Sequence, residues 1–273
     1  MLLSLARSTH PGPAIAVSAI AVVLGAGVGL EPWRLAVLGL MFLANQASIG
    51  LSNDWIDADR DRAVGRTDKP VAAGLVSVST ARTAAIVTAM LAIVLSVPLG
   101  WPAALAQFVF LASGWSYNAG LKRTPLSAVP YLVGFGSIPL IVTLSLPIPA
   151  LASPWAVLAG ALLGLAAHFA NVLPDLDDDR ATGVQGLPHR MGLRASGLII
   201  AGGVAGASAS IVFGLGDALP VQYVGFGLVA ALAAWCGYLV IARPGSRLVF
   251  RLIIAAALIT VLLLAVSGAR LLA

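Results

Sequence analysis

Charged residues are scarce in this chain. Only 10% of its 273 residues are Asp, Glu, Lys or Arg, while 59% are hydrophobic and the mean hydropathy is +0.98. A soluble domain carries roughly a quarter charged residues, so this chain lacks the charge needed to cover a water-facing surface. The composition excludes a soluble globular enzyme, a disordered chain and a nucleic-acid-binding protein, although the isoelectric point is about 10.0.

Cysteine and histidine are also rare. The single cysteine, Cys236, cannot form an intramolecular disulfide. The three histidines, His10, His168 and His189, are scattered along the chain, so the sequence predicts no zinc site. No Walker loop and no Rossmann glycine pattern occurs, which disfavours a nucleotide-driven pump.

Long apolar stretches, by contrast, recur along the whole chain. A membrane-spanning helix needs roughly 20 apolar residues. Nine such stretches occur, at 12–30, 33–52, 77–99, 102–118, 126–147, 153–172, 195–215, 219–241 and 248–269. The sequence therefore predicts an all-α polytopic membrane protein that forms a single domain over 1–273 with nine transmembrane helices.

The basic residues predict the orientation of these helices. With nine helices, fourteen of the sixteen Lys and Arg residues fall on one side, and only Arg34 and Arg270 fall on the other. Basic residues mark the cytoplasmic side. We therefore expect a multi-pass protein of the cell membrane with a cytoplasmic N-terminus and an external C-terminus. Anionic lipid headgroups account for the net positive charge without any nucleic acid.

Nine of the eleven acidic residues lie in two connections on the predicted cytoplasmic side. The first connection carries Asp54, Asp57, Asp59, Asp61 and Asp68, and the second carries Asp175, Asp177, Asp178 and Asp179. Acidic residues contribute little to membrane orientation, so this concentration requires another explanation.

The two acidic segments are copies of each other. A shift of 118 positions aligns 53–75 with 171–193 and gives ten identities in 23 positions. Four helices separate the copies, so both enter from the same face. This is a parallel internal repeat. It predicts two pseudo-symmetric halves with a site between them.

Helical periodicity selects the acids that converge. At about 100° per residue, Asn53, Asp57 and Asp61 fall on one arc, and Asp54 borders it. The second copy repeats the arc with Asn171, Asp175 and Asp179. Oxygen ligands gathered in this way suit Mg²⁺. The alternative is a pair of solvated acidic loops that pair with neighbouring arginines.

Two of the repeated acids, Asp59 and Asp177, point away from these arcs.

The basic residues beside the arcs predict that a phosphate group bridges them and Mg²⁺. These candidate diphosphate-binding residues, with a nearby tyrosine, are Arg66, Lys69, Tyr117, Lys122, Arg123 and Arg190. A metal-bound diphosphate at the mouth of an apolar bundle implies a lipid tail inside the bundle.

These motifs resemble those of the UbiA superfamily of intramembrane prenyltransferases. The resemblance rests on the N-D-x-x-D-x-x-x-D pattern at 53–61 and the basic-Pro stretch at 65–70. It also rests on the second aspartate motif at 171–179 with its L-P-x-R-x-G tail at 187–192, and on Tyr117 with Lys122 and Arg123.

The resemblance implies nine helices around a central cavity, with both aspartate motifs binding Mg²⁺ and an isoprenyl diphosphate. The implied reaction transfers the prenyl group to an aromatic or lipid acceptor within the membrane. The catalytic residues would be Asp54, Asp57, Asp61, Asp175 and Asp179. One departure is Val172, which stands where the first copy has Asp54, so the two metal sites should be unequal.

Three other functions use similar residues. A UbiA-type terpene cyclase would use the same metal site without an acceptor, and a phosphoribosyl transferase would act on a polyprenyl phosphate. A cation transporter could also use the aspartates, but transporter sites lie near the membrane midplane rather than at one end.

Overall fold

The computed structural model describes residues 2–176, 183–242 and 247–273, and these residues are almost entirely helical. The only extended pairing among them is an isolated bridge between Ala152 and Leu272. The all-α prediction is therefore confirmed. The elements are α1 (Leu2–Arg7), α2 (Pro11–Gly27), α3 (Pro32–Ile56), α4 (Ala58–Ala63), α5 (Val78–Ser96), η1 (Val97–Leu99), α6 (Trp101–Ala119), η2 (Leu121–Arg123), α7 (Val129–Leu144), α8 (Pro154–Val172), η3 (Leu173–Asp175), α10 (Leu187–Gly214), α11 (Pro220–Ala242), α12 (Arg247–Val266) and η4 (Gly268–Leu271).

Each predicted apolar stretch coincides with a long helix in the described part of the chain. Five of these helices, α3, α5 with η1, α8, α10 and α11, are long and apolar enough to cross a membrane. Three more apolar segments are shorter: Pro11–Gly27, Val129–Leu144 and Arg251–Val266. The protein is thus a multi-pass helical membrane protein, and the number of nine crossings stays a prediction.

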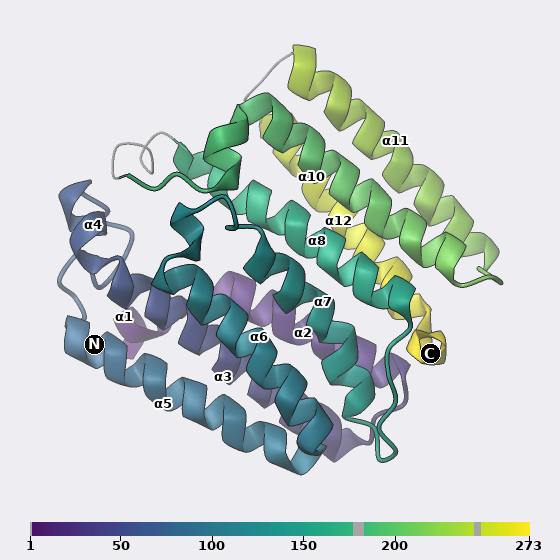
Figure 1. The fold of residues 1–273 in the computed structure, drawn as a ribbon, viewed down its shortest axis with the longest axis horizontal. Helices are drawn as coiled ribbons and strands as arrows, with labels where there is room; N and C mark the ends of the chain where they lie inside the picture. Colours follow the sequence, from purple (N-terminus) through teal and green to yellow (C-terminus); the bar gives the residue numbers. More distant parts are fainter. Residues whose placement is uncertain (1, 177–182, 243–246) are drawn as a thin grey trace.

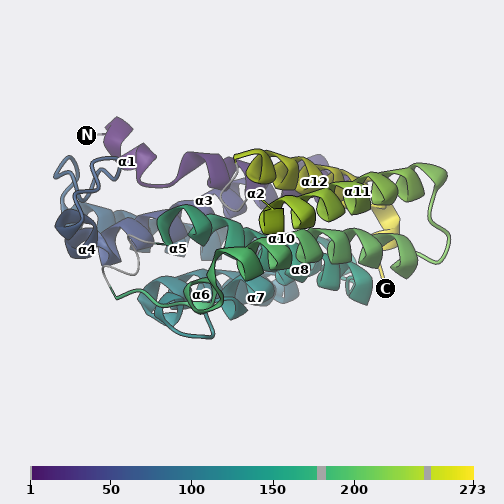
Figure 2. The same ribbon diagram turned by 90° about the horizontal axis from the view of Figure 1, so that it is seen from above.

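The long helices form a closed bundle (Figures 1 and 2). Going round it, α2 packs on α3, α3 on α6, α6 on α7, α7 on α8, α8 on α10, α10 on α12, and α12 back on α2. Helices α5 and α11 lie at opposite edges of this bundle, α5 against α3 and α11 against α10 and α12. The outward face of α5 is apolar, with Ile86, Met90 and Val94 exposed, as a lipid-facing helix requires.

The two repeat copies share left-handed glycines at matching positions. Gly65 and Gly183 have φ of 71° and 77°, and Gly74 and Gly192 have φ of 74° and 78°. Glycine adopts this left-handed region without the penalty that other residues incur. The tight packing of α3 on α5 likewise has its counterpart in α8 on α10.

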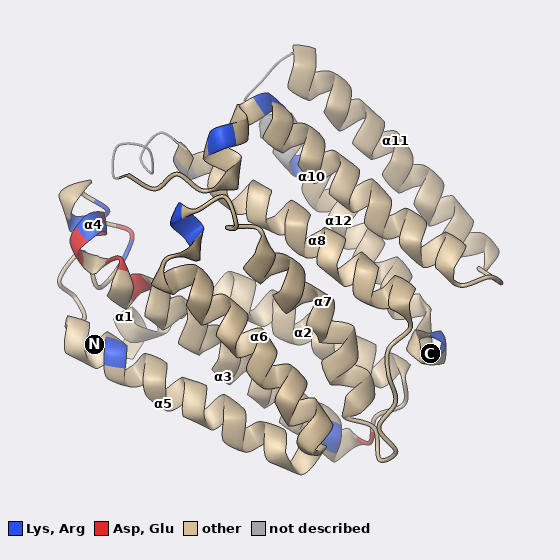
Figure 3. Ribbon diagram, viewed as in Figure 1, with Lys and Arg blue, Asp and Glu red and all other residues tan. Residues whose placement is uncertain are grey.

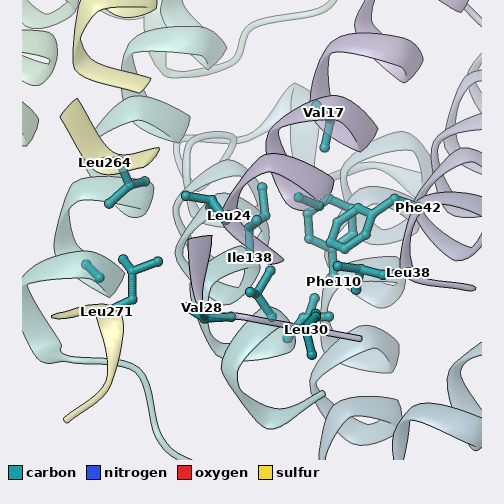
Figure 4. Close-up of a cluster of buried hydrophobic side chains, with 14 of the residues drawn as sticks. Val17, Leu24, Val28, Leu30, Leu38, Phe42, Phe110, Ile138, Leu264 and Leu271 are labelled. Atoms are coloured by element: carbon teal, nitrogen blue, oxygen red, sulfur yellow. The ribbon is translucent and has the colours of Figure 1, made fainter. Parts of the chain in front are cut away.

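A buried apolar cluster fills the end of the bundle that carries the α2–α3 turn and the C-terminus (Figure 4). Its side chains come from α2, α3, α6, α7, α8, α10 and α12 and include Leu24, Leu38, Phe42 and Ile138. The charged residues gather at the other end, around α4, η2 and the start of α10, which we call the charged end (Figure 3). The interior is therefore closed at one end and polar at the other.

Candidate functional site at the charged end

The first aspartate motif lies where α3 passes into α4. Helix α3 ends at Ile56, α4 begins at Ala58, and Asp57 joins them at φ −90° and ψ 0°. The expected single helix is therefore broken at Asp57. The break is slight, because the backbone N–H of Asp57 still donates to Asn53 O (3.0 Å) and that of Asp61 to Asp57 O (2.8 Å). The motif residues consequently keep a common face.

Three carboxylates of this motif are buried. Asp54, Asp57 and Asp61 are 1%, 1% and 2% exposed. The exposed member is Asp59, whose carboxylate pairs with Arg62 at 2.6 Å and points to solvent. This placement agrees with the helical periodicity, which directs Asp59 away from the other acids.

Lys69 links two of the buried carboxylates. Its Nζ lies 2.9 Å from Asp61 Oδ2 and 3.6 Å from Asp54 Oδ1, and it donates a hydrogen bond to Asn53 Oδ1 at 3.0 Å. Lys69 reaches the motif because the chain after α4 turns back at Gly65, where φ is 71°. The basic residue that follows the motif in sequence therefore becomes part of the same cluster.

Lys122 and Arg60 neutralise the third carboxylate. Lys122 Nζ donates to Asp57 Oδ2 at 2.5 Å, and Arg60 Nη2 donates to the same oxygen at 3.1 Å and to Asp61 Oδ1 at 3.2 Å. Burial lowers the pKa of Lys122, an effect that the charge of Asp57 opposes. Arg60 thus faces the buried carboxylates, whereas Arg62, two positions further along α4, is exposed and pairs with Asp59.

The fourth contact to the motif comes from the N-terminal segment. His10 Nε2 lies 3.0 Å from Asp54 Oδ1, and His10 has the left-handed backbone of φ 53° and ψ 64°. The segment lies close against α3 at Gly50, where a β-carbon would be only 2.6 Å from Thr9 O. No sequence pattern links His10 to Asp54, 44 residues later, so sequence reasoning missed this contact.

Asn118 orients the amide of Asn53. It donates from Nδ2 to Ile49 O (2.9 Å) and Ser52 Oγ (2.8 Å), and its Oδ1 accepts a hydrogen bond from Asn53 Nδ2 at 3.3 Å. Asn53 thereby directs Oδ1 towards Lys69. Asn45, two turns earlier on α3, is fully buried and is not among the residues that line the two cavities beside this cluster.

Two adjoining cavities open beside this cluster. The larger has a volume of about 570 Å³ and the smaller about 90 Å³. Both are lined by Asn53, Arg66, Lys69, Tyr117 and Asn171. The larger cavity continues between α2, α3, α6 and α7, where apolar residues such as Ile49, Phe110 and Phe135 form its wall. The smaller contains Asp57, Arg60 and Lys122.

An aromatic group lies where the two cavities meet. Tyr117 and Tyr131 make an edge contact with ring centroids 5.2 Å apart, and His168 lies 4.9 Å from Tyr131. His168 Nε2 is 3.0 Å from Ser127 Oγ. Asn171 of the second motif is within reach of this group, because its Nδ2 is 3.5 Å from Tyr131 Oη.

The other candidate cations are placed differently. Arg66 lines both cavities and forms a two-pronged pair with Asp68, with Nε–Oδ1 of 2.8 Å and Nη2–Oδ2 of 2.9 Å. Arg123 and Arg190 are exposed, and neither is among the residues that line the two cavities. Arg190 instead donates to Gln185 O at 3.1 Å.

The second aspartate motif is only partly described. Asp175 ends the short helix η3, while its side chain and the segment 177–182, with Asp177, Asp178 and Asp179, lie outside the described residues. Among the described residues, no group of three His, Cys, Asp or Glu side chains is arranged to hold a metal ion. In the first motif, Lys69 and Lys122 contact the carboxylates directly.

The donors of the first motif nevertheless suit a hard cation. Within the described part of the protein, Asp54 Oδ2 and Asp57 Oδ1 are buried and accept no hydrogen bond. A buried carboxylate oxygen without a partner is costly. Together with Asn53, these residues present carboxylate and amide oxygens, which are the ligands that Mg²⁺ takes in proteins. The residues present therefore fit a Mg²⁺ ion.

Comparison with known proteins assigns the family. The model of the UbiA prenyltransferase family matches residues 14–259. The chain belongs to this family. Among UbiA structures, a homolog from Archaeoglobus fulgidus bound to DMAPP and Mg²⁺ superposes with a TM-score of 0.74 at 16% identity, over 97% of this chain and 99% of the other. A homolog from Aeropyrum pernix K1 gives 0.73 at 20% identity, over 91% and 95%.

Two curated UbiA relatives match half of the chain. A 4-hydroxybenzoate octaprenyltransferase from Ralstonia nicotianae is 33% identical over 49% of this chain and 46% of its own length. A digeranylgeranylglyceryl phosphate synthase from Korarchaeum cryptofilum is 28% identical over 54% and 53%. The match thus spans about half the length of each relative. The structural likeness establishes the UbiA fold, and the acceptor differs between the two relatives.

Proposed function

We propose that this UbiA protein catalyses Mg²⁺-dependent transfer of a prenyl group from a prenyl diphosphate to an aromatic or lipid acceptor in the membrane. The observation that carries the proposal is the cluster of buried carboxylates and cations at the polar end of an otherwise apolar cavity. The two curated relatives, whose names describe an aromatic and a lipid acceptor, support it. So do neighbours of the same fold bound to GPP or DMAPP with Mg²⁺.

In this proposal the acidic motifs hold the metal. The ligands would be Asn53, Asp54, Asp57 and Asp61 of the first copy with Asn171, Asp175 and Asp179 of the second. Bound Mg²⁺ supplies positive charge that stabilises the diphosphate leaving group. Asp57 is buried, and the hydrogen bonds of Asn53 to Asp57 and Asn118 hold these side chains in place before any ligand arrives.

The cations bind the diphosphate. Lys69 Nζ lies between Asp54 and Asp61, and Lys122 Nζ contacts Asp57. Arg66 lines both cavities beside them. Positive groups positioned where negative charge develops lower the barrier to ionisation. Tyr117 lines both cavities, and in this proposal it would contact the first carbons of the prenyl chain.

The apolar cavity protects the carbocation that ionisation leaves behind. Ile49, Phe110 and Phe135 present no nucleophile and exclude water from the interior. The faces of Tyr117 and Tyr131 offer π-electron density to a cation. An electron-rich acceptor that enters the same cavity then forms a bond to the prenyl carbon and releases one proton, while the diphosphate leaves. The bilayer supplies the hydrophobic substrates. We propose that the charged end faces the cytoplasm, because the basic residues gather there.

Turnover in proteoliposomes tests the proposal. Purified protein is incubated with a labelled prenyl diphosphate, Mg²⁺ and either 4-hydroxybenzoate or an archaeal-type glycerol phosphate lipid, and products are identified by mass spectrometry. We expect acceptor-dependent release of diphosphate and a prenylated acceptor, both absent in an Asp57→Asn variant.

Each alternative function gives a different result. Release of a hydrocarbon without any acceptor identifies a terpene cyclase. Transfer of a phosphoribosyl group to a polyprenyl phosphate identifies a phosphoribosyl transferase. Mg²⁺ uptake into the vesicles with no diphosphate released identifies a transporter. Each of these outcomes contradicts prenyl transfer.

A further inference from the structure

The inner limit of the larger cavity is defined by one residue on each of four helices. Counting from the charged end, the innermost lining residues are Ala14 on α2, Gln46 on α3, Phe110 on α6 and Phe135 on α7. Helix α8 contributes only Asn171, which lies at the charged end. The cavity therefore enters the bundle from the charged end and stops part-way.

One turn beyond these residues, three of the four helices carry side chains of the buried apolar cluster. Moving away from the charged end, Val17 comes after Ala14 on α2, Phe42 after Gln46 on α3, and Ile138 after Phe135 on α7. All three belong to the buried apolar cluster (Figure 4). Phe110 belongs to both the wall and the cluster, and its ring meets that of Phe42 edge to face with centroids 5.6 Å apart. Phe110 is thus the floor of the cavity, and Phe42 supports it from behind.

The depth of the cavity follows from helix geometry. From Asp54 to Gln46 on α3, and from Asn118 to Phe110 on α6, the wall covers eight residues, or about 12 Å at 1.5 Å per residue. An extended isoprene unit, with four carbons along the chain, advances about 5 Å at ordinary carbon–carbon bond lengths. The space below the carboxylates therefore accommodates two isoprene units when extended and three when the chain bends.

A glycine beside the floor keeps this space open. A β-carbon at Gly134 on α7 would lie 3.0 Å from Ser113 Oγ and 3.7 Å from Phe110 Cε2. Any side chain at this position would narrow the cavity next to Phe110. Ligand pockets are concave and lined mostly by apolar and aromatic side chains, and here a glycine beside an aromatic floor leaves room for a slim chain of limited length.

We propose that Phe110, supported by Phe42, sets an upper limit on the length of the prenyl donor, and that the donor is a ten- or fifteen-carbon prenyl diphosphate. The inference rests on the proposed function, because it requires the diphosphate to bind at Lys69 and Lys122. A twenty-carbon chain would have to displace Phe110 from a packed core, which is costly.

Competition binding with a series of diphosphates tests this length limit without requiring turnover. Dimethylallyl, geranyl, farnesyl, geranylgeranyl and octaprenyl diphosphates compete with labelled geranyl diphosphate on the purified protein in nanodiscs with Mg²⁺. We expect affinity to rise from dimethylallyl to geranyl, since more apolar surface is buried, and to fall at least about tenfold from farnesyl to geranylgeranyl. Phe110→Ala should reduce that fall to within about threefold by lengthening the cavity.

Two further variants keep the test decisive. Phe108→Ala removes an aromatic ring from the same helix at a position that is 55% exposed and outside the cavity, so its length profile should match that of the unmodified protein. Gly134→Ala should act in the opposite direction and weaken farnesyl binding more than dimethylallyl binding. If Phe110→Ala does not fold, Gly134→Ala carries the test.

The outcomes separate the length limit from the proposed function. If the unmodified protein binds no prenyl diphosphate of any length, the proposed function is wrong and the length limit falls with it. Equal binding of all lengths, or a Gly134→Ala effect that is equal for all lengths, overturns the length limit alone. Either result would mean that the prenyl tail leaves the cavity sideways, between two helices, instead of ending at Phe110.

Discussion

Lys122 Nζ donates a hydrogen bond to Asp57 Oδ2 at 2.5 Å, across 65 residues of sequence. The contact joins the turn after α6 to the junction between α3 and α4, so it ties together two walls of the cavity. Both groups are buried, with Lys122 5% and Asp57 1% exposed. A buried ion pair is destabilised strongly when one partner is removed, and this asymmetry makes the pair a sensitive point for mutation.

Lys122 and Arg123 should therefore differ, although they are neighbours. We expect Lys122→Met to weaken diphosphate binding at least about tenfold and to lower the free energy of unfolding, because Asp57 loses a charged partner. Arg123→Met should change diphosphate binding by less than about twofold and the free energy of unfolding by less than about 0.5 kcal/mol, since Arg123 is exposed. Isothermal titration with geranyl diphosphate and thermal unfolding in detergent measure the two effects. Equal losses in the two variants would argue for a diffuse basic surface instead.

Asp57 and Asp59 provide a matched pair within one motif. Asp57→Asn keeps the size of the side chain but removes the charge expected to bind Mg²⁺, so turnover should fall at least about 100-fold, or about 2.7 kcal/mol of transition-state stabilisation. Asp59→Asn should remain within about threefold, because Asp59 points to solvent and forms an exposed ion pair with Arg62. Initial rates in proteoliposomes compare them. A severe defect in Asp59→Asn would show that total charge in the connection matters more than position.

Metal dependence follows from the donor atoms. Carboxylate and amide oxygens bind Mg²⁺ and Mn²⁺ rather than a soft metal, so excess EDTA should abolish turnover. Added Mg²⁺ or Mn²⁺ should restore it, and a zinc-selective chelator should have no effect. Full turnover in excess EDTA would contradict the metal assignment.

The pair between Arg66 and Asp68 predicts a change in stability at low pH. The hydrogen bond from Arg66 lowers the pKa of Asp68 from 3.8 to about 2. Because the folded state binds this proton less readily than the unfolded state, the contribution is present above pH 4 and lost as pH falls towards 2. Asp68 is 62% exposed, so solvent screening limits the contribution to about 1 kcal/mol at most.

Thermal unfolding across a pH series checks this effect. The unmodified protein should unfold at a higher temperature than Asp68→Asn above pH 4, and the two curves should converge as the pH approaches 2. A difference that persists unchanged at pH 2 would mean that Asp68 stabilises the protein through packing rather than through its charge.

The sequence alone was sufficient for the helices, the membrane class and the location of the first acidic motif. No water is available in the lipid interior to bond backbone N–H and C=O groups. A long apolar stretch that crosses it therefore forms a helix, which pairs these groups internally. The repeated glycines are also readable from sequence: Gly65 and Gly183 share a positive φ that other residues avoid. Periodicity separated Asp57 from Asp59, since the motif stays close to helical and one face is buried.

Only the tertiary structure decided which distant residues complete the site. Sequence reasoning treated Lys122 and Arg123 alike, but the short helix η2 turns Lys122 inward and leaves Arg123 exposed. His10 reaches Asp54 through packing of the N-terminal segment against Gly50, and the cavity floor at Phe110 depends on Phe42 from another helix. Such contacts join residues far apart in the chain, and their geometry is set by how the helices pack rather than by any local pattern.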